Sequence, residues 1–219
     1  MSLPYFHIIL IFGLFSASLS ASDSDGNPFA VVGEQVNHQI PDGWELAWMS
    51  GESDGRFFVE YIPADEEINS WHSGYLLIER IPLPSAEALE EIRSMKTTLP
   101  EMALHHFIEQ AKTGCRGEHK EISRSVNKFN DILFAMSGGF CSRYENSAPY
   151  GEGAFVAFLE GHHNIFRIQY ACRPTSDNNK NNLSTWGITP DMAEKFLNAI
   201  KSTTLCGSEN QPVCQIKYQ

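Results

Sequence analysis

Alternating apolar and polar positions are clearest in two short segments, residues 56–62 and 75–81. In the first segment, every second residue from Phe57 to Tyr61 is apolar and falls on one face, because successive residues of a strand point to opposite faces. Pro63 follows and ends the predicted strand, since proline has no backbone N–H to donate to a sheet. The pattern therefore predicts two neighbouring β-strands.

The connector between these strands, residues 64–74, carries three acidic side chains and Trp71. We expect the connector to lie in solvent, with the tryptophan folded back as an apolar anchor. Glu60 and Glu79 lie one in each strand. A facing pair of carboxylates, of the kind that glycoside hydrolases use, is one interpretation. The interpretation that we favour places both glutamates on the wetter face of the sheet.

The remaining pattern predicts more strands and two helical regions. The predicted strands are residues 44–49, 121–129, 132–136, 154–160 and 165–172. Helical spacing covers residues 85–113 and 190–202, with Ser85 and Thr189 placed as N-caps. Pro100 predicts a break or kink, because a helix interior does not tolerate proline. The fold class predicted is α+β, an antiparallel sheet of about six to eight strands with helices packed on it.

One stretch resembles a known family. The residues Glu60-Tyr61-Ile62-Pro63, followed by Glu66, Ile68 and Trp71, resemble the E-Y-[VI]-P…E-x-[VI]-x-x-W signature of small, uncharacterised exported proteins of proteobacteria. That group has no established activity, so the resemblance implies an exported location and a fold but no catalytic residues. The implied fold looks like the PsbP-like sandwich, an antiparallel sheet with packed helices. We take as candidate binding residues Glu60, Tyr61, Pro63, Glu66 and Trp71.

The chain begins like an exported protein. Residues 8–15 form an apolar run, and small residues follow up to Ala21. This pattern predicts a signal peptide over residues 1–21, although residues 1–7 hold no lysine or arginine. An uncleaved anchor is the alternative, but the apolar run is much shorter than the roughly 20 residues that span a bilayer. We expect residues 22–219 to form a single periplasmic or secreted domain with no stable membrane anchor after cleavage.

Net charge limits the possible partners. The chain carries a formal charge of −11 at pH 7. A surface this acidic repels nucleic acid and anionic lipid. We therefore expect no nucleic-acid partner, and a protein partner in the envelope, if there is one, that is basic or neutral.

Five cysteines in an exported chain predict disulfides, and none of them forms a CxxC pair. The favoured bridge between Cys115 and Cys141 would tie a helix end to a strand. The favoured bridge between Cys206 and Cys214 would close a short loop in the tail. A bridge from Cys172 to Cys206 competes with the second, and an odd count leaves at least one thiol free or paired between chains.

The candidate chemistry is weak. The pairs His105-His106 and His162-His163 could supply ligands for zinc or copper, most directly through His106 and His163. No HxxxH or HExxH spacing places two histidines on one helical face, and no G-x-S-x-G motif marks a serine nucleophile. A cysteine nucleophile would have to be Cys172.

Aromatic residues beside polar loops suggest recognition instead of catalysis. They are Trp71, Tyr75, Tyr144, Tyr150 and Trp186. A competing interpretation is that the two tryptophans only close the ends of the sheet. We expect a non-enzymatic binding or accessory protein, immunity- or chaperone-like, that needs no cofactor. The alternative is a metal-dependent hydrolase that uses the paired histidines.

Overall fold

The computed structural model describes residues 32–145, 147–176, 183–208, 211–212 and 214. These residues belong to one compact unit, residues 31–219. The predicted signal peptide, residues 1–21, lies outside the described residues. None of the helices in the described ranges has both the length and the apolar character needed to span a bilayer.

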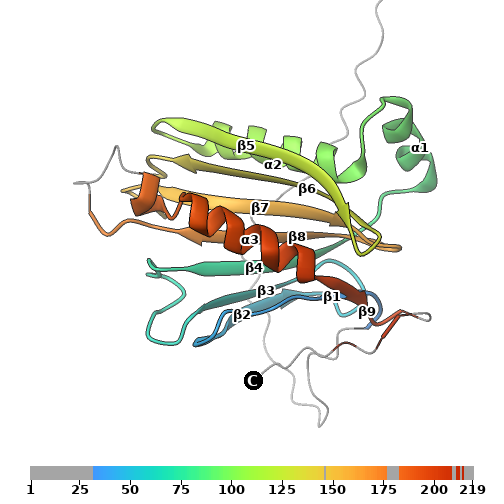
Figure 1. Cartoon of the computed structure of the whole chain (residues 1–219), viewed down its shortest axis with the longest axis horizontal. Coiled ribbons are helices and arrows are strands. Elements are labelled where there is room, and N and C mark those ends of the chain that lie inside the picture. The colour runs from blue at the N-terminus through green and yellow to red at the C-terminus, as the bar shows by residue number, and fades with distance from the viewer. Residues whose placement is uncertain (1–31, 146, 177–182, 209–210, 213, 215–219) are drawn as a thin grey trace, which may run out of the picture. The chain divides into compact units, whose positions relative to one another are not determined.

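Seven antiparallel strands form the main sheet, in the order β2-β3-β4-β8-β7-β6-β5 (Figure 1). Their bounds are β2 Trp44–Gly51, β3 Phe57–Pro63, β4 Tyr75–Pro82, β5 His119–Phe129, β6 Ile132–Cys141, β7 Glu152–Glu160 and β8 Asn164–Cys172. Two short strands, β1 (Gln35–Asn37) and β9 (Thr204–Cys206), pair separately and join the two ends of the described chain. The α+β class and the antiparallel sheet predicted from the sequence are confirmed.

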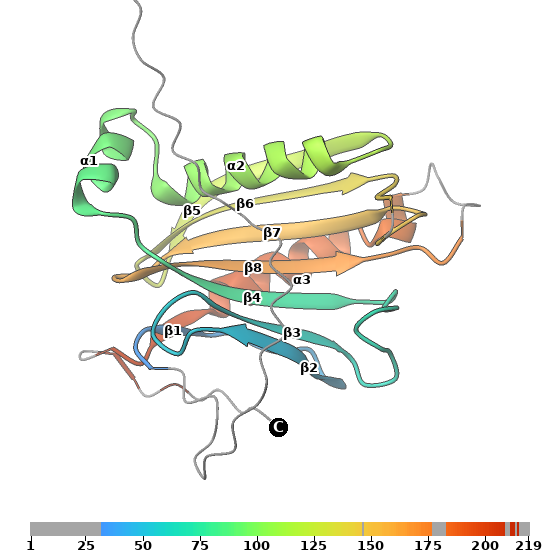
Figure 2. The same cartoon turned by 180° about the vertical axis from the view of Figure 1, so that it is seen from behind.

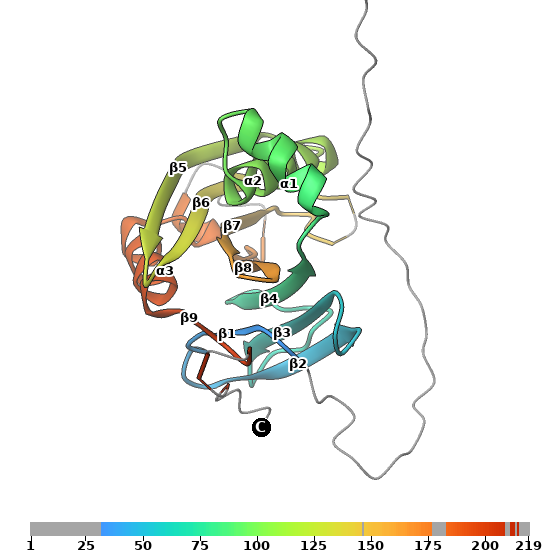
Figure 3. The same cartoon turned by 90° about the vertical axis from the view of Figure 1, so that its right-hand side faces the viewer.

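Helices cover both faces of this sheet. The connection from β4 to β5 contains α1 (Ala86–Ser94) and α2 (Leu99–Gly114), and α2 packs on β6 and β7. The 3-10 helix η2 (Leu183–Trp186) precedes α3 (Pro190–Ser202). In Figure 1 α3 crosses in front of the sheet, and in Figure 2 α2 lies in front of it. The view along the strands in Figure 3 places the two helices on opposite faces.

The helix ends follow the capping residues in the sequence. The side chains of Ser85 and Thr189 accept hydrogen bonds from backbone N–H groups three residues later, as predicted. The break predicted at Pro100 is present, and it lies just before this residue, between α1 and α2. The chain leaves α1 before it, and Pro100 lies in the first turn of α2 behind the N-cap Thr98. Proline is accepted there because the first helical N–H groups have no partner within the helix.

The apolar core is divided by the sheet into two main clusters. The larger cluster lies on the α3 side and includes Leu76, Phe134, Phe166 and Phe196. The second cluster lies under α2 and includes Leu104 of the helix and Phe158 of β7. α2 packs mainly on β6 and β7, and on β8, β4 and β3 the same face of the sheet carries polar side chains.

Two disulfides are present, Cys115–Cys141 and Cys206–Cys214, which are the two bridges favoured from the sequence. The first joins the C-cap of α2 to the end of β6. The competing bridge from Cys172 to Cys206 is not formed, and Cys172 is a free thiol. Burial raises the pKa of this thiol to about 11, so little of it is thiolate at neutral pH.

Removal of the Cys115–Cys141 bridge by a double replacement with alanine is expected to lower the free energy of unfolding by about 3 kcal/mol. The same change at Cys206 and Cys214 is expected to cost about 2 kcal/mol, because the bridge closes a shorter loop. The sequence separations are 26 and 8 residues. Urea unfolding of both variants measures the difference, with Cys172→Ala as the control. A larger loss from the shorter loop would contradict the expectation.

Candidate functional site

The part of the sheet that α2 leaves uncovered carries a row of polar and aromatic side chains. Glu60 on β3 pairs with Leu77 on β4, and Leu77 pairs with Gln169 on β8. One step along the strands, Glu79 pairs with Arg167. Alternate residues share a face, so these side chains point to the α2 side.

A groove of about 500 Å³ lies over this part of the sheet. Its floor comes from the strands and its walls come from the connector between β3 and β4 and the end of β8. The lining residues that carry charge or aromatic rings are Glu60, Trp71, Tyr75, Glu152, Arg167 and Arg173. A concave site with convergent ionisable groups is the usual form of a binding site.

Glu79 supports one end of the groove from below. Its side chain is 1 % exposed, and it accepts a hydrogen bond from Arg56 Nε at 2.7 Å. Arg167 Nε lies 2.9 Å from the other carboxylate oxygen, an ion-pair contact without hydrogen-bond geometry. The Arg167 guanidinium also lies 5.3 Å from the centre of the Phe107 ring of α2. Burial lowers the pKa of Arg167, and the Glu79 carboxylate opposes that change.

Glu60 lines the groove and is half-buried. The Tyr75 hydroxyl donates a hydrogen bond of 2.7 Å to its carboxylate. Burial raises the pKa of Glu60, although this hydrogen bond and the charge of Arg167 act in the opposite direction. Burial and the Glu60 charge together raise the pKa of Tyr75 far above its usual value, so the hydroxyl keeps its proton.

Trp71 and Arg173 form the wall beside Tyr75. Trp71 is buried and stacks on Tyr75, with ring centroids 4.8 Å apart. The Arg173 guanidinium lies 3.8 Å from the centre of the Trp71 ring. Arg173 Nε also donates a hydrogen bond of 2.9 Å to Glu152. The stacked rings and the ion pair hold this wall in one arrangement.

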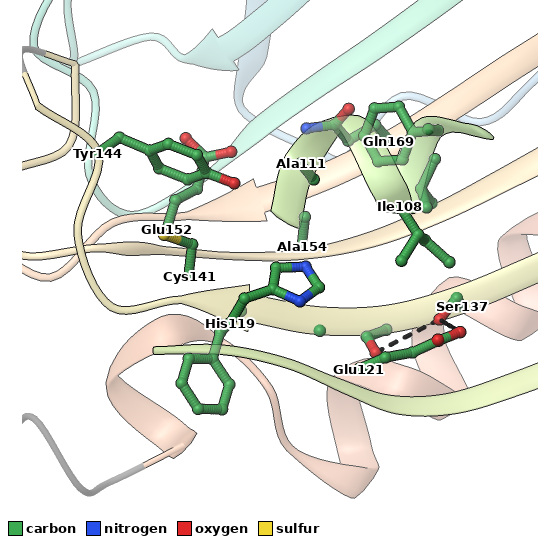
Figure 4. Close-up of a pocket in the computed structure, with 15 residues that line it drawn as sticks. Ile108, Ala111, His119, Glu121, Ser137, Cys141, Tyr144, Glu152, Ala154 and Gln169 are labelled. Atoms are coloured by element: carbon green, nitrogen blue, oxygen red, sulfur yellow. Dashed lines mark hydrogen bonds between the residues drawn. The ribbon is translucent and has the colours of Figure 1, made fainter. Parts of the chain in front are cut away.

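A smaller pocket of about 60 Å³ adjoins the groove under the C-terminal half of α2 (Figure 4). Glu152 and Gln169 line both spaces. In Figure 4 Tyr144 and Glu152 lie at one end of the pocket, with His119 and then Glu121 and Ser137 further along. Burial raises the pKa of Glu152, and Arg173 offsets part of that effect. The volume is small enough that the pocket suits water or a single small group.

The histidine, glutamate and serine of this pocket do not form a nucleophilic triad. Ser137 Oγ lies 2.8 Å from a carboxylate oxygen of Glu121 and 2.6 Å from the carbonyl oxygen of Ser123, so its proton is taken by one of these acceptors. A triad requires the histidine between the serine and the acid. Burial and the nearby Lys112 lower the pKa of His119, which leaves its ring neutral at neutral pH.

Two of the five predicted binding residues, Glu60 and Trp71, line the groove. Trp71 and Trp186 are both buried. Neither tryptophan is therefore an exposed aromatic residue of the kind that the recognition hypothesis expects. Tyr61 is also buried, in the core on the opposite face, and Pro63 ends β3. Glu66 accepts hydrogen bonds from the backbone N–H groups of His72 and Ser73, so it shapes the connector.

The expectation for Glu79 was wrong, since this residue lies in the interior and not on a wetter face. The facing pair of carboxylates is not formed either, because Glu60 lies opposite Leu77 and Glu79 opposite Phe58. Alternation assigned both glutamates to the correct common face. The alternation did not show that Arg56 and Arg167 form ion pairs with Glu79 on that face.

The paired histidines do not assemble a metal site. His106 shares a hydrogen bond with Gln110 one turn later in α2, and His163 is exposed in the turn between β7 and β8. Among the described residues, no group of three or more histidine, cysteine, aspartate or glutamate side chains is placed to hold a metal ion. The hydrolase alternative therefore has no ligand set in this part of the chain.

Sequence reasoning missed four charged residues of the site, which are Glu152, Arg167, Arg173 and the supporting Arg56. Arg167 interrupts the apolar run from Ile165 to Ile168 in β8, and such an interruption was the available signal. Glu152 and Arg173 lie at strand ends, where a charged residue is ordinary.

Comparisons with known proteins add little to this geometry. No protein-family model matches the chain, and no curated protein matches it. Among solved structures, the solution structure of cyanobacterial PsbP (CyanoP) from Synechocystis sp. PCC 6803 is 11 % identical in sequence. The match covers 85 % of this chain and 98 % of that chain, with a TM-score of 0.42. A likeness of this size assigns no function.

Proposed function

We propose that the protein is a non-enzymatic binding protein whose groove receives a basic side chain of a polypeptide partner. The observation that carries the proposal is the Glu60 carboxylate. Of the three glutamates in and below the groove, Glu79 and Glu152 have arginines at ion-pair distance, and Glu60 has none among the described residues. Its carboxylate has the Tyr75 hydroxyl as its hydrogen-bond donor.

A partly buried carboxylate with no cation at ion-pair distance is costly to the folded chain, since burial disfavours its charged form and the charge of Arg167 offsets only part of that effect. A lysine or arginine side chain placed in the groove would supply the missing charge. Tyr75 and Trp71 would cover the apolar stem of such a side chain. The net charge of −11 would increase the rate at which a basic partner arrives.

The proposal extends to the setting of the protein. An immunity- or chaperone-like factor that covers a basic partner in the periplasm or outside the cell fits this groove. The two disulfides support an oxidising compartment. We also propose that the chain belongs to the exported proteobacterial group, which the Glu60–Trp71 signature supports. We propose a PsbP-like sandwich as its fold, which the antiparallel sheet with helices on both faces supports.

Binding of a defined basic peptide tests the proposal. A capped, fluorescent oligoarginine peptide is expected to bind the exported protein, and the matching oligocitrulline peptide, which has the same shape without charge, is not. Glu60→Gln is expected to weaken binding about tenfold, because it removes the charge that pairs with the guanidinium. Glu67→Gln is the matched control, since Glu67 is exposed in the connector and the change in net charge is the same.

Fluorescence anisotropy at low and moderate salt measures the affinities. Equal losses from Glu60→Gln and Glu67→Gln would show attraction by net charge alone and would contradict a specific site. Glu60→Gln is expected to unfold at the same or a higher urea concentration than the wild type. A glutamate whose pKa is raised in the folded state stabilises below its unfolded pKa and loses that contribution as pH rises, so its ionised form is unfavourable at neutral pH.

A further inference from the structure

A second and larger cavity lies on the other face of the sheet, beside α3. Its volume is about 690 Å³, within the range of sites that bind small molecules. It is bounded by α3, by the segment that follows η2, by β7 and β8, and by the turn before β2. It shares no lining residue with the groove around Glu60, so the two spaces are independent.

Aromatic rings form the walls of this cavity. Tyr170 lies at the centre of the set, with its ring centroid 5.9 Å from that of Trp44 and 5.5 Å from that of Phe196. Phe155 stacks against Phe196 at 5.8 Å, and Trp186 is buried at the same cavity. Rings that hold one another in place present a preformed apolar surface, so a bound molecule would not have to order it.

One hydroxyl inside the cavity has no hydrogen-bond partner among the described residues. The Tyr170 hydroxyl makes no hydrogen bond with any residue that the structure describes, and burial raises the pKa of this tyrosine far above its usual value. The hydroxyl therefore stays protonated and can donate or accept one hydrogen bond. Asp42 and Lys195 line the cavity and are exposed, so they lie at its open side with opposite charges.

We propose that this cavity binds a small neutral amphiphile, with a flat aromatic body and one hydrogen-bonding group that reaches Tyr170. The aromatic walls select a flat apolar body, because rings pack against rings in stacked or edge-on arrangements. The opposite charges of Asp42 and Lys195 give no preference for a charged ligand. The single unpartnered hydroxyl selects a molecule with one polar group.

Titration with N-phenyl-1-naphthylamine tests the proposal, since this neutral dye has fused rings and a single N–H. The exported chain is expected to bind it saturably, one to one, with micromolar affinity. Ala199 lines the cavity from α3, and Ala199→Trp is expected to abolish binding by filling the space. Glu194→Trp is the matched control, because Glu194 is exposed on the same helix and does not line the cavity.

Tyr170→Phe removes only the hydroxyl and tests the site if the bulky variant does not fold. It is expected to weaken dye binding about fivefold, the effect of one hydrogen bond. Cys172 supplies a second readout, since this free thiol lines the cavity, and bound dye is expected to slow its alkylation by N-ethylmaleimide. Unsaturable uptake, or binding that survives both Ala199→Trp and Tyr170→Phe, would overturn the proposal.

Discussion

Replacement of Glu79 by glutamine is expected to lower the free energy of unfolding by about 4 kcal/mol, one of the two largest losses that we expect from a single charge change in this chain. Glu79 is 1 % exposed and has arginines on both sides. Arg56 is partly exposed and can turn toward water, but Arg167 lies between the sheet and Phe107. The substitution leaves the mostly buried guanidinium of Arg167 without its counter-ion. An unpaired buried charge lowers stability by more than the ion pair itself contributes.

Urea unfolding measures the loss, and Glu109→Gln is the control. Glu109 forms an exposed ion pair with Lys112, so its replacement is expected to cost less than about 0.5 kcal/mol. The double variant Glu79→Leu with Arg167→Met removes both charges and is expected to regain most of the loss. A double variant no more stable than Glu79→Gln would mean that local packing, and not an unpaired charge, sets the effect.

Local chemistry made the elements of the fold predictable. Thr189 followed by Pro190 places the start of α3 at the predicted residue, since an N-cap and a first-turn proline act within one turn of chain. Asn130 and Asp131 form the predicted turn between β5 and β6, and both have positive φ angles, which these residue types tolerate. Such features need no knowledge of distant residues.

The charged parts of the site could not be predicted because their partners come from distant strands. Alternation identifies Glu79 as a polar residue in an apolar strand and says nothing about the arginines that neutralise it. The register of β4 against β8 brings Arg167 beside Glu79, and register depends on the whole sheet. Trp71 was predictable as an anchor because one large apolar side chain in an acidic connector has few other places to go.

Glu34 is a second buried carboxylate that only the tertiary structure explains. It lies before β1, is 2 % exposed and accepts hydrogen bonds at 2.9 Å from the backbone N–H groups of His162 and His163 in the turn between β7 and β8. Gln211, from the loop closed by the second disulfide, donates to it at 3.0 Å. One carboxylate thus joins the beginning of the described chain, a hairpin turn and the tail. Gly161 makes room, because a Cβ there would lie 2.5 Å from a carboxylate oxygen.

Glu34→Gln is expected to lower the free energy of unfolding by about 4 kcal/mol at neutral pH, because an amide has one acceptor oxygen for several donors and its NH₂ group would face backbone N–H groups. Burial alone would raise the pKa of Glu34, but the hydrogen bonds from His163, His162, Gln211 and Asn164 outweigh it and lower the pKa below its usual value. A lowered pKa in the folded state means that the carboxylate stabilises fully above its unfolded pKa and loses that contribution as pH falls through the folded value.

The difference between wild type and Glu34→Gln is therefore expected to be large at about pH 7 and to shrink by about pH 3, as protonation removes the acceptor from the wild type as well. Urea unfolding at the two pH values measures it, with Glu90→Gln as an exposed control that should show no difference at either. An equal difference in unfolding free energy at both pH values would mean that the shape of the side chain, and not its charge, is what stabilises the fold here. A gap that closes on acidification would identify Glu34 as the charged link that holds the two ends of the described chain against the hairpin.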